Sequence, residues 1–259
     1  MSKRWRLLRI YGGGPTETIL DVIREEKLDV SVVLGVWIAP EARLDEKGRA
    51  AEDLPEARAS NEREAAEAVR LAGVYPEIVS AISVGNETQI FWSGHRVPQD
   101  LLIGYVRSVR AGTSVPVTVA DDFNFWNKPE STAIARELDF VMMHAHPLWN
   151  GLQLEDALAW TKGVVAEVQS VHPDHLIVLG ETGWATQRHS EGEQAKLMKG
   201  KLGEDEQKAF YDAVNAWTDT ERVPVFFFEA FDENWKGGEH PDEVEKHWGL
   251  YRADRTPKK

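Results

Sequence analysis

The sequence predicts an α/β fold, and within that class a (β/α)8 barrel of the TIM type. Short runs rich in Val, Ile, Leu and Phe alternate with longer segments of helical periodicity. Continuous apolar runs are typical of strands in parallel sheets, and the alternation is typical of consecutive βαβ units. Seven such units favour a barrel over a doubly wound sheet. No linker or repeat divides the chain, so we expect one domain over residues 1–259.

Seven apolar runs are the expected strands, and they end near Tyr11, Trp37, Gly85, Asp121, His144, Gly180 and Glu229. The clearest helical patterns lie between them, over residues 61–72, 98–111, 154–168 and 205–217. Asn61 stands three residues before Glu64, as in a capping box, so we expect a helix to begin at Asn61. The charged segments 39–60 and 186–204 are expected to be helix-poor loops that follow strands.

Composition and charge argue against several classes of function. The net charge of −13 disfavours a nucleic-acid partner, because binding to a phosphate backbone depends on clustered Lys and Arg. No apolar stretch approaches the roughly 18 residues of a membrane-spanning helix. The absence of cysteine excludes disulfides and thiolate metal sites. We identify no signal peptide, so a cytoplasmic location and export with a leader outside this sequence both stay open.

Polar and aromatic side chains gather at the carboxyl ends of the expected strands, where barrels of this class place their chemistry. Half of the ten tryptophans follow strands closely, and flat rings of this kind can stack on the apolar faces of sugars. The candidate site residues at these ends are Tyr11, Trp37, Asn86, Glu87, Asp121, His144, His146, Trp149, Glu181, Trp184, Glu233 and Lys236.

Two glutamates stand out among these residues, because Glu87 ends SVGNE, Glu181 ends LIVLGE, and an aromatic residue follows each. Glycoside hydrolysis needs two carboxyl groups that flank one bond. One is protonated and releases the leaving group, and the other is ionised and attacks the anomeric carbon or activates water. The ends of two strands could hold such a pair rigidly. The alternative is that both glutamates are solvated residues at the rim of the fold.

Two other features allow a second interpretation. His144 and His146 could bind a metal together with Asp232, as in metal-dependent barrel hydrolases. The remaining histidines lie before strands or in loops, so we favour hydrogen bonding in a polar cleft and expect no metal or cofactor. Phe91 and Trp92 are expected to pack beneath the rim, with contact to sugar as the alternative.

Several motifs together resemble glycoside hydrolase family 17, in particular its bacterial branch that acts on β-1,3-glucans. The motifs that carry the resemblance are RLLRIYG, VVLGVWI, SVGNE, HAHPLWNG, LIVLGETGW, FFFEAFDENWK and HWGLYRADRTPK. They occur in the family's order and with roughly its spacing, from about residue 6 to the end of the sequence. VGNE and GETGW at this separation are specific only in combination.

The resemblance implies a (β/α)8 barrel and a retaining, double-displacement mechanism. It makes Glu87 the acid/base and Glu181 the nucleophile, with carboxyl groups about 5–5.5 Å apart. Asn86 matches the residue that binds the sugar 2-hydroxyl. Glu233 and Lys236 match the polar group that supports the site, and the positions expected to line sugar subsites are Tyr11, Trp37, His146, Trp149 and Trp184. The implied substrate is a β-1,3-glucan or oligosaccharide, cleaved by hydrolysis or transferred by a glucanosyltransferase reaction.

The sequence departs from the family at its beginning. The family's first β/α unit has no counterpart before RLLRIYG, so this unit is either absent or lies outside this sequence, and we expect about seven strands here. An exposed sheet edge would then need a cover, for example by self-association. A competing hypothesis is a β-glucan-binding protein with impaired catalysis, and a less favoured one is the metal-dependent hydrolase. Endo or exo action stays open at this point.

Overall fold

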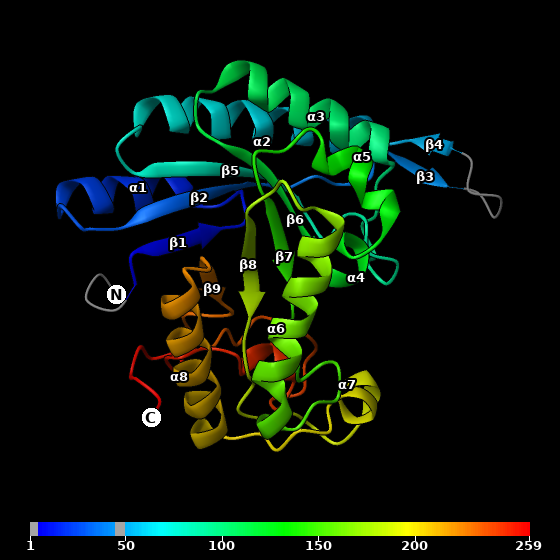
Figure 1. Cartoon of the computed structure of the whole chain (residues 1–259). Helices are drawn as coiled ribbons and strands as arrows, with labels where there is room; N and C mark the ends of the chain where they lie inside the picture. Colours follow the sequence, from blue (N-terminus) through cyan, green and yellow to red (C-terminus); the bar gives the residue numbers. More distant parts are fainter. Residues whose placement is uncertain (1–4, 45–49) are drawn as a thin grey trace. The chain divides into compact units, whose positions relative to one another are not determined.

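The computed structural model describes residues 5–44 and 50–259. The chain divides into two compact units. Unit 1 comprises Met1–Met142 and Val171–Leu176, and unit 2 comprises Met143–Ser170 and Ile177–Lys259. Figure 1 labels the helices and strands along the chain.

Unit 1 is built on parallel strands that neighbour one another in the order of the sequence. Its strands are β1 (Leu7–Ile10), β2 (Ser31–Val36), β5 (Val79–Asn86) and β6 (Val117–Asp122), and β7 (Val141–His144) begins in it. The register pairs Leu34 of β2 with Ile82 of β5, and Ile82 with Val117 of β6. Every residue of β6 is buried, as expected for a parallel strand covered on both faces.

The helices of unit 1 follow its strands. They are α1 (Thr16–Glu25), α2 (Pro55–Val74), α3 (Gln99–Gly112), α4 (Phe123–Trp126), η1 (Pro129–Ser131) and α5 (Thr132–Ala135). α2 packs on β2 and β5, α3 packs on β5 and β6, and the two helices contact each other (Figure 1). Their buried faces carry small and branched apolar residues such as Ala68, Leu71, Leu102 and Val106.

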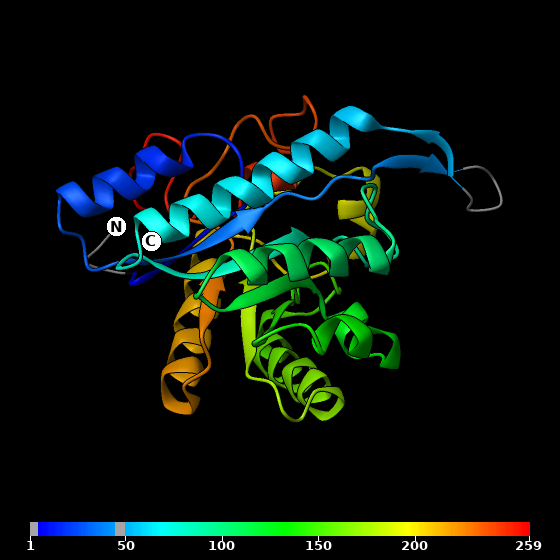
Figure 2. The same cartoon turned by 90° about the horizontal axis from the view of Figure 1, so that it is seen from above.

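An antiparallel hairpin between β2 and α2 is absent from the sequence-based prediction. It consists of β3 (Ala42–Leu44) and β4 (Ala50–Asp53), and it projects beyond the start of α2 (Figure 2). At its base the Leu54 amide donates to the Glu41 carbonyl at 2.7 Å. Residues 45–49, within the predicted loop 39–60, lie outside the described residues.

The Glu41 side chain anchors this hairpin. Its carboxylate is 9% exposed and accepts hydrogen bonds from Arg58 Nε at 3.0 Å, Asn61 Nδ2 at 3.1 Å and the Tyr105 hydroxyl at 2.5 Å. Burial alone would raise the pKa of Glu41, but these three hydrogen bonds outweigh burial and lower it. The point at which the hairpin joins the rest of unit 1 is therefore held in place by hydrogen bonds and by the ion pair between Glu41 and Arg58.

The prediction that a helix begins at Asn61 is wrong, because α2 begins at Pro55. Proline suits the first turn of a helix, since its missing N–H has no intrahelical partner there. Asn61 lies inside α2, 1% exposed, and its amide bonds the Ala39 N–H and carbonyl, both at 2.9 Å. The residues of the capping-box pattern, Asn61 and Glu64, thus form hydrogen bonds to distant parts of the chain and do not cap the helix. Residues 55–60, the last part of the segment 39–60 that was predicted to be helix-poor, are thus helical.

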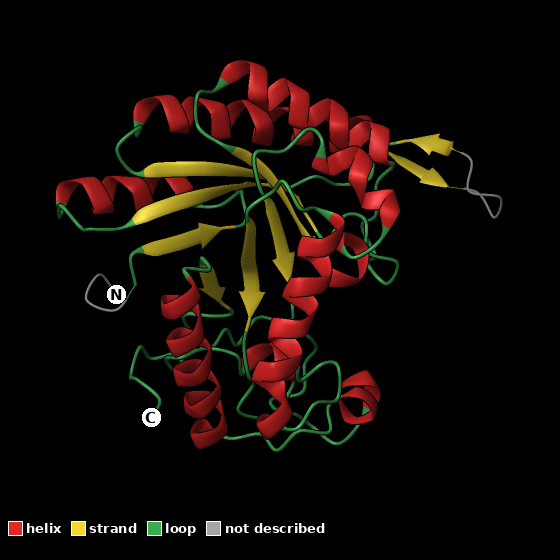
Figure 3. Ribbon diagram, in the orientation of Figure 1, coloured by secondary structure: helices red, strands yellow, loops and turns green. Residues whose placement is uncertain are grey.

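Unit 2 contains the second half of β7 and the parallel pair β8 and β9, with Leu179 of β8 opposite Val225 of β9. Its elements are β8 (Ile177–Thr182), β9 (Val225–Phe227), α6 (Leu154–Val171), α7 (Gly192–Leu197), α8 (Glu204–Glu221) and η2 (Val244–Lys246). Figure 3 shows that the chain after β9 is mostly loop. α7 lies within segment 186–204, which was expected to be helix-poor.

The seven predicted strands correspond to β1, β2, β5, β6, β7, β8 and β9. The helices predicted over 98–111, 154–168 and 205–217 correspond to α3, α6 and α8. Within the described part of the chain, every helix is too short or too polar to span a bilayer. The structure thus confirms the two strands whose carboxyl ends carry the glutamates: Glu87 directly follows β5, and Glu181 lies near the end of β8.

Candidate active site

Glu87 is the first residue after β5, and both Glu87 and Gly85, near the end of the strand, have unusual backbone conformations. Gly85 has φ of +81°, and an added Cβ there would lie 3.1 Å from Leu102 and 3.2 Å from Thr88. Glu87 itself has φ of +49°, in the left-handed region, and its amide donates to the Ala120 carbonyl at 2.9 Å. A non-glycine residue in this region costs about 1–3 kcal/mol, and such strain is concentrated at functional sites. The VGNE sequence therefore encodes a turn that leads out of the strand and positions Glu87.

Arg9 fixes the orientation of the Asn86 side chain. Its Nη2 lies 2.5 Å from Asn86 Oδ1, and its guanidinium stacks 4.4 Å from the centroid of the Tyr11 ring. A guanidinium can only donate hydrogen bonds, so the amide oxygen must face Arg9. The Nδ2 group of Asn86 consequently points elsewhere as a donor. Sequence reasoning missed Arg9, because β1 alone does not show which strand-end side chain it meets.

Asp121 secures the loop that follows Glu87. This carboxylate is fully buried and accepts hydrogen bonds from three backbone amides: Gln89 at 2.8 Å, Ile90 at 3.2 Å and Asp122 at 2.9 Å. Asp121 was a candidate for sugar contact. None of its surface is exposed, and both of its oxygens accept hydrogen bonds from the backbone. Asp121 therefore stabilises the loop and does not contact sugar directly.

The pKa of Asp121 gives a pH-dependent prediction. Burial raises this pKa to about 8, against the opposing effect of the amides of Gln89 and Asp122, and the charge of Glu87 adds to the rise. A raised folded-state pKa means that the contribution of Asp121 to stability is complete below pH about 4 and declines until pH about 8. In thermal unfolding, the stability advantage of the unaltered chain over Asp121→Asn should therefore shrink as pH rises from 5 to about 8.

Asp139→Asn is the matched control for this measurement. Burial tends to raise the pKa of Asp139, but hydrogen bonds from Arg110 and the Val117 amide lower it overall. Its contribution is lost only as pH falls through the acidic range, so its effect should be constant from pH 5 to about 8. A parallel pH course for the two variants would contradict the assignment for Asp121.

His95 connects the loop after β5 to the loop after β2. Its Nε2 lies 2.7 Å from the Asn86 carbonyl oxygen, and its ring lies 4.7 Å from that of Trp37, centroid to centroid, with a 30° interplanar angle. The Ser93 hydroxyl lies 3.2 Å from His95 Nδ1. Trp37 is 39% exposed. This histidine was also missed from the sequence, because no local pattern ties residue 95 to residue 37.

In unit 2, Glu181 lies in β8 between two imidazoles. His144 Nε2 is 3.4 Å from Glu181 Oε1, and His146 Nε2 is 3.3 Å from Glu181 Oε2. The Ala145 amide donates to the Glu181 carbonyl at 2.9 Å, which fixes the backbone as well. Glu181 is 7% exposed and His144 is fully buried. The two predicted histidines thus orient the carboxylate, and His144 has no surface for direct contact with sugar.

The backbone after Glu181 packs closely against the chain that follows β9. A Cβ on Gly183 would lie 2.1 Å from the Phe228 carbonyl oxygen, so only glycine fits in the GETGW motif. Trp248 contacts the rings of His146 and Phe228 edge-on, at centroid distances of 5.3 and 5.9 Å. These contacts hold the His146 ring in place beside Glu181.

Lys236 lies between two carboxylates. Its Nζ bonds Glu229 Oε2 and lies 2.8 Å from Glu233 Oε2. Burial raises the pKa of Glu229, and the Lys236 ammonium opposes that rise. Glu245 also has a pKa raised by burial, with His146 and Lys236 opposing and Glu181 adding to the rise. Glu229 was expected at the end of the last strand but was not among the candidate site residues, and Glu245 was missed from the sequence.

The other candidate residues differ in their exposure. Trp184 is 1% exposed, donates to the Lys201 carbonyl at 2.9 Å and packs against Phe210, so it is a core residue. Tyr11 and Trp149 are half-buried and retain accessible surface. These positions leave Tyr11, Trp37 and Trp149 as the aromatic candidates for sugar contact.

The side chains proposed as metal ligands, His144, His146 and Asp232, have other partners in the structure. Asp232 pairs with Lys258 at 2.8 Å and accepts from the Gly249 amide at 3.0 Å. His144 and His146 both face Glu181. Over residues 5–44 and 50–259, no three histidine or carboxylate side chains are grouped in a way that could hold a metal ion.

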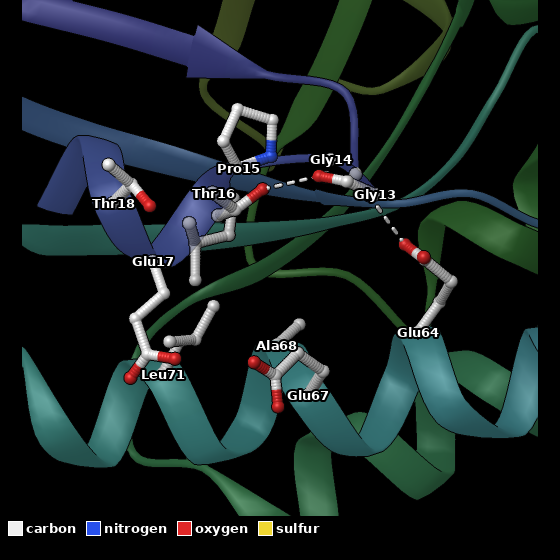
Figure 4. A pocket seen from close by; sticks show the side chains of 13 residues that line it. Gly13, Gly14, Pro15, Thr16, Glu17, Thr18, Glu64, Glu67, Ala68 and Leu71 are labelled. Atoms are coloured by element: carbon white, nitrogen blue, oxygen red, sulfur yellow. Dashed lines mark hydrogen bonds between the residues drawn. The ribbon is translucent and has the colours of Figure 1, made fainter.

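A separate pocket of about 310 Å³ lies in unit 1 between the loop after β1 and helix α2 (Figure 4). The Gly13 amide donates to Glu64 Oε2 at 2.9 Å, and the Thr16 hydroxyl donates to the Gly13 carbonyl at 2.7 Å. Glu17 and Glu67 make the lining acidic, and both pair with Arg70. None of the candidate site residues lines this pocket.

Known proteins that resemble this chain in sequence or structure are named as β-1,3-glucan-active enzymes. A glucan 1,3-beta-glucosidase of Schizosaccharomyces pombe is 28% identical over 97% of this chain and 75% of its own length. The crystal structure of an endo-laminarinase from Formosa Hel1_33_131 matches with a TM-score of 0.83 and 26% identity, over 98% of this chain and 76% of that one.

The structure of a glycoside hydrolase family 17 β-1,3-glucanosyltransferase from Rhizomucor miehei matches with a TM-score of 0.73 and 22% identity, over 98% of this chain and 84% of that one. The two structural similarities confirm the predicted (β/α)8-type barrel class. The sequence profile of one family covers residues 1–249. The chain therefore belongs to the BtgE/BtgC glycoside hydrolase domain family, and this result supports the resemblance to glycoside hydrolase family 17.

Proposed function

We propose that this glycoside hydrolase domain cleaves β-1,3-glucosidic bonds of glucans with retention, and passes the glycosyl group to water or to another sugar. The observation that carries the proposal is the position of Glu181, a nearly buried carboxylate whose two oxygens face His144 and His146. A nucleophilic carboxylate must be held in one orientation to attack an anomeric carbon. The named activities of the similar glucosidase and endo-laminarinase support the choice of β-1,3-glucan.

In the first step, an oxygen of Glu181 forms a bond to the anomeric carbon while the bond to the leaving oxygen breaks. Glu87 donates its proton to that oxygen, so the shortened glucan leaves as a neutral alcohol. The product of this step is a covalent glycosyl-enzyme. His144 and His146, whose Nε2 atoms face its two oxygens, keep Glu181 in place during this step.

In the second step, Glu87 removes a proton from water or from a sugar hydroxyl, which attacks the same carbon and displaces Glu181. Two inversions give overall retention. The Nδ2 donor of Asn86, oriented by Arg9, is suited to bind the 2-hydroxyl, whose hydrogen bonds strengthen in the transition state. Lys236 with Glu229 and Glu233 supplies a charged group for the neighbouring hydroxyls.

The catalytic pair stays a prediction, because Glu87 belongs to unit 1 and Glu181 to unit 2. The expected carboxyl separation of about 5–5.5 Å follows from the retaining mechanism. If the family's first β/α unit is absent, self-association is one way to cover an open sheet edge. Both can be checked, the first in a complex with an oligosaccharide and the second by light scattering.

Product analysis on β-1,3-oligosaccharides of defined length tests the function. The first-formed reducing ends, followed by NMR before mutarotation, should be β anomers. Products longer than the substrate would mean transfer, and release of single glucose units would mean exo action. First-formed α anomers would overturn the retaining mechanism, and binding without any product over hours would overturn the enzymatic function.

A further inference from the structure

Two aromatic residues in the loop after β5 are exposed to solvent. Phe91 is 68% exposed and Trp92 is 50% exposed, and their rings meet edge to face at 4.7 Å with an interplanar angle of 81°. The expectation that they pack beneath the rim is therefore wrong. Burial of a large aromatic ring is normally favourable, so two adjacent exposed rings need an explanation.

The exposure of these rings does not come from a loosely held loop. The amides of Gln89 and Ile90 are bonded to the buried Asp121 carboxylate. The Ser93 amide donates to the Ile90 carbonyl, and the Val97 amide donates to the Thr88 carbonyl, both at 3.1 Å. The loop thus presents the pair in a fixed conformation, which reduces the entropy lost when a ligand binds.

The loop continues directly from the proposed acid/base. Phe91 lies four residues after Glu87, and His95 of the same loop lies 2.7 Å from the Asn86 carbonyl oxygen and stacks on Trp37. A residue that protonates the leaving oxygen faces the part of the substrate that departs. The loop that extends from Glu87 is therefore placed to meet that same part.

We propose that Phe91 and Trp92 form a binding surface for the glucose units on the leaving-group side of the cleaved β-1,3 bond. This inference rests on the proposed function. Glucose rings in β linkage carry C–H groups on both faces, and such faces pack on aromatic rings. Successive units of a β-1,3-linked chain turn relative to one another. Two ring planes at 81° can accordingly receive successive units, whereas one flat platform would suit a ribbon-like chain.

The test compares Trp92→Ala with the unaltered chain on two substrates. One is a long β-1,3-oligosaccharide, and the other is an aryl β-glycoside whose leaving group is a phenol without sugar. On the long substrate kcat/KM should fall by roughly 3- to 10-fold, the effect of one aromatic contact. On the aryl glycoside it should change by less than about 2-fold, because no sugar occupies the leaving-group side.

Two further variants control the experiment. Trp92→Phe should retain most of the activity on the long substrate, because it keeps a flat ring. Leu176→Ala removes an apolar side chain that is 55% exposed outside this loop, and it should leave both activities unchanged.

Three results would overturn the inference. An equal loss on both substrates would mean a structural role. An unchanged kcat/KM on both substrates would mean no contact with the glucan. Loss of self-association in Trp92→Ala, without any change in length dependence, would mean that a second copy of the chain covers the rings. Failure of the proposed function is distinct, since the unaltered chain would then cleave neither substrate.

Discussion

Glu181→Gln should reduce turnover of β-1,3-glucan by roughly 10³- to 10⁵-fold, the order seen when a catalytic group that forms a covalent intermediate is lost. The amide has nearly the shape of the carboxylate but cannot form the glycosyl-enzyme. Binding of a β-1,3-oligosaccharide, measured by calorimetry, should stay within about an order of magnitude of the unaltered chain. The variant therefore separates binding from chemistry.

A rescue experiment makes the assignment of Glu181 more specific. In Glu181→Ala, azide can enter the space left by the carboxylate and attack the anomeric carbon of an activated aryl β-glycoside. One inversion then gives the α-glycosyl azide, which NMR identifies. Glu193→Gln is the matched control, because this glutamate is exposed on α7 and pairs only with Lys196 among the ion pairs described. Substantial residual turnover in Glu181→Gln would refute its role as nucleophile.

Glu87→Ala should show a loss that depends on the leaving group. Cleavage of an unactivated β-1,3-glucan needs protonation of a poor leaving group, so its rate should fall by roughly 10²- to 10⁴-fold. A dinitrophenyl glycoside departs without that proton, so formation of the glycosyl-enzyme should be nearly unaffected. The second step then becomes slow, and a burst of dinitrophenol should precede the steady state.

Azide distinguishes the two glutamates by stereochemistry. In Glu87→Ala it should intercept the glycosyl-enzyme that Glu181 has formed, so two inversions give the β-glycosyl azide. A loss of equal size for both substrates, or an α-glycosyl azide from this variant, would show that Glu87 is not the acid/base. The opposite anomers expected from the two variants make the role assignments independent of rate alone.

The sequence predicts most of the strands because their signal is local. Runs such as VSVVLGV and LIVLGET need no knowledge of their neighbours to be assigned. The start of α2 was predicted wrongly, because the side chains of Asn61 and Glu64 bond Ala39, Glu41 and Gly13 rather than the helix end. Such distant contacts give the same local pattern as a cap.

The same distinction between local and distant contacts separates the site residues that could be predicted from those that could not. The position of Glu87 could be predicted, because Gly85 and the strand before it mark the turn. The burial of Asp121 and Trp184 could not, since a residue at a strand end can point to a cleft or into the core. Arg9 and His95 were missed because their importance comes from Asn86, which each meets from a different part of the sequence.

The β3–β4 hairpin is a position at which the length and sequence of this domain could change. Its two ends already meet through the bond between Leu54 and Glu41, and Arg58, Asn61 and Tyr105 hold that junction from elements outside the hairpin. The segment between these ends can thus be lengthened, shortened or exchanged without moving β2 or α2. Each doubling of its length would add only about 0.6 kcal/mol of closure entropy. We therefore expect changes in the length of this segment to leave the folding of unit 1 largely intact.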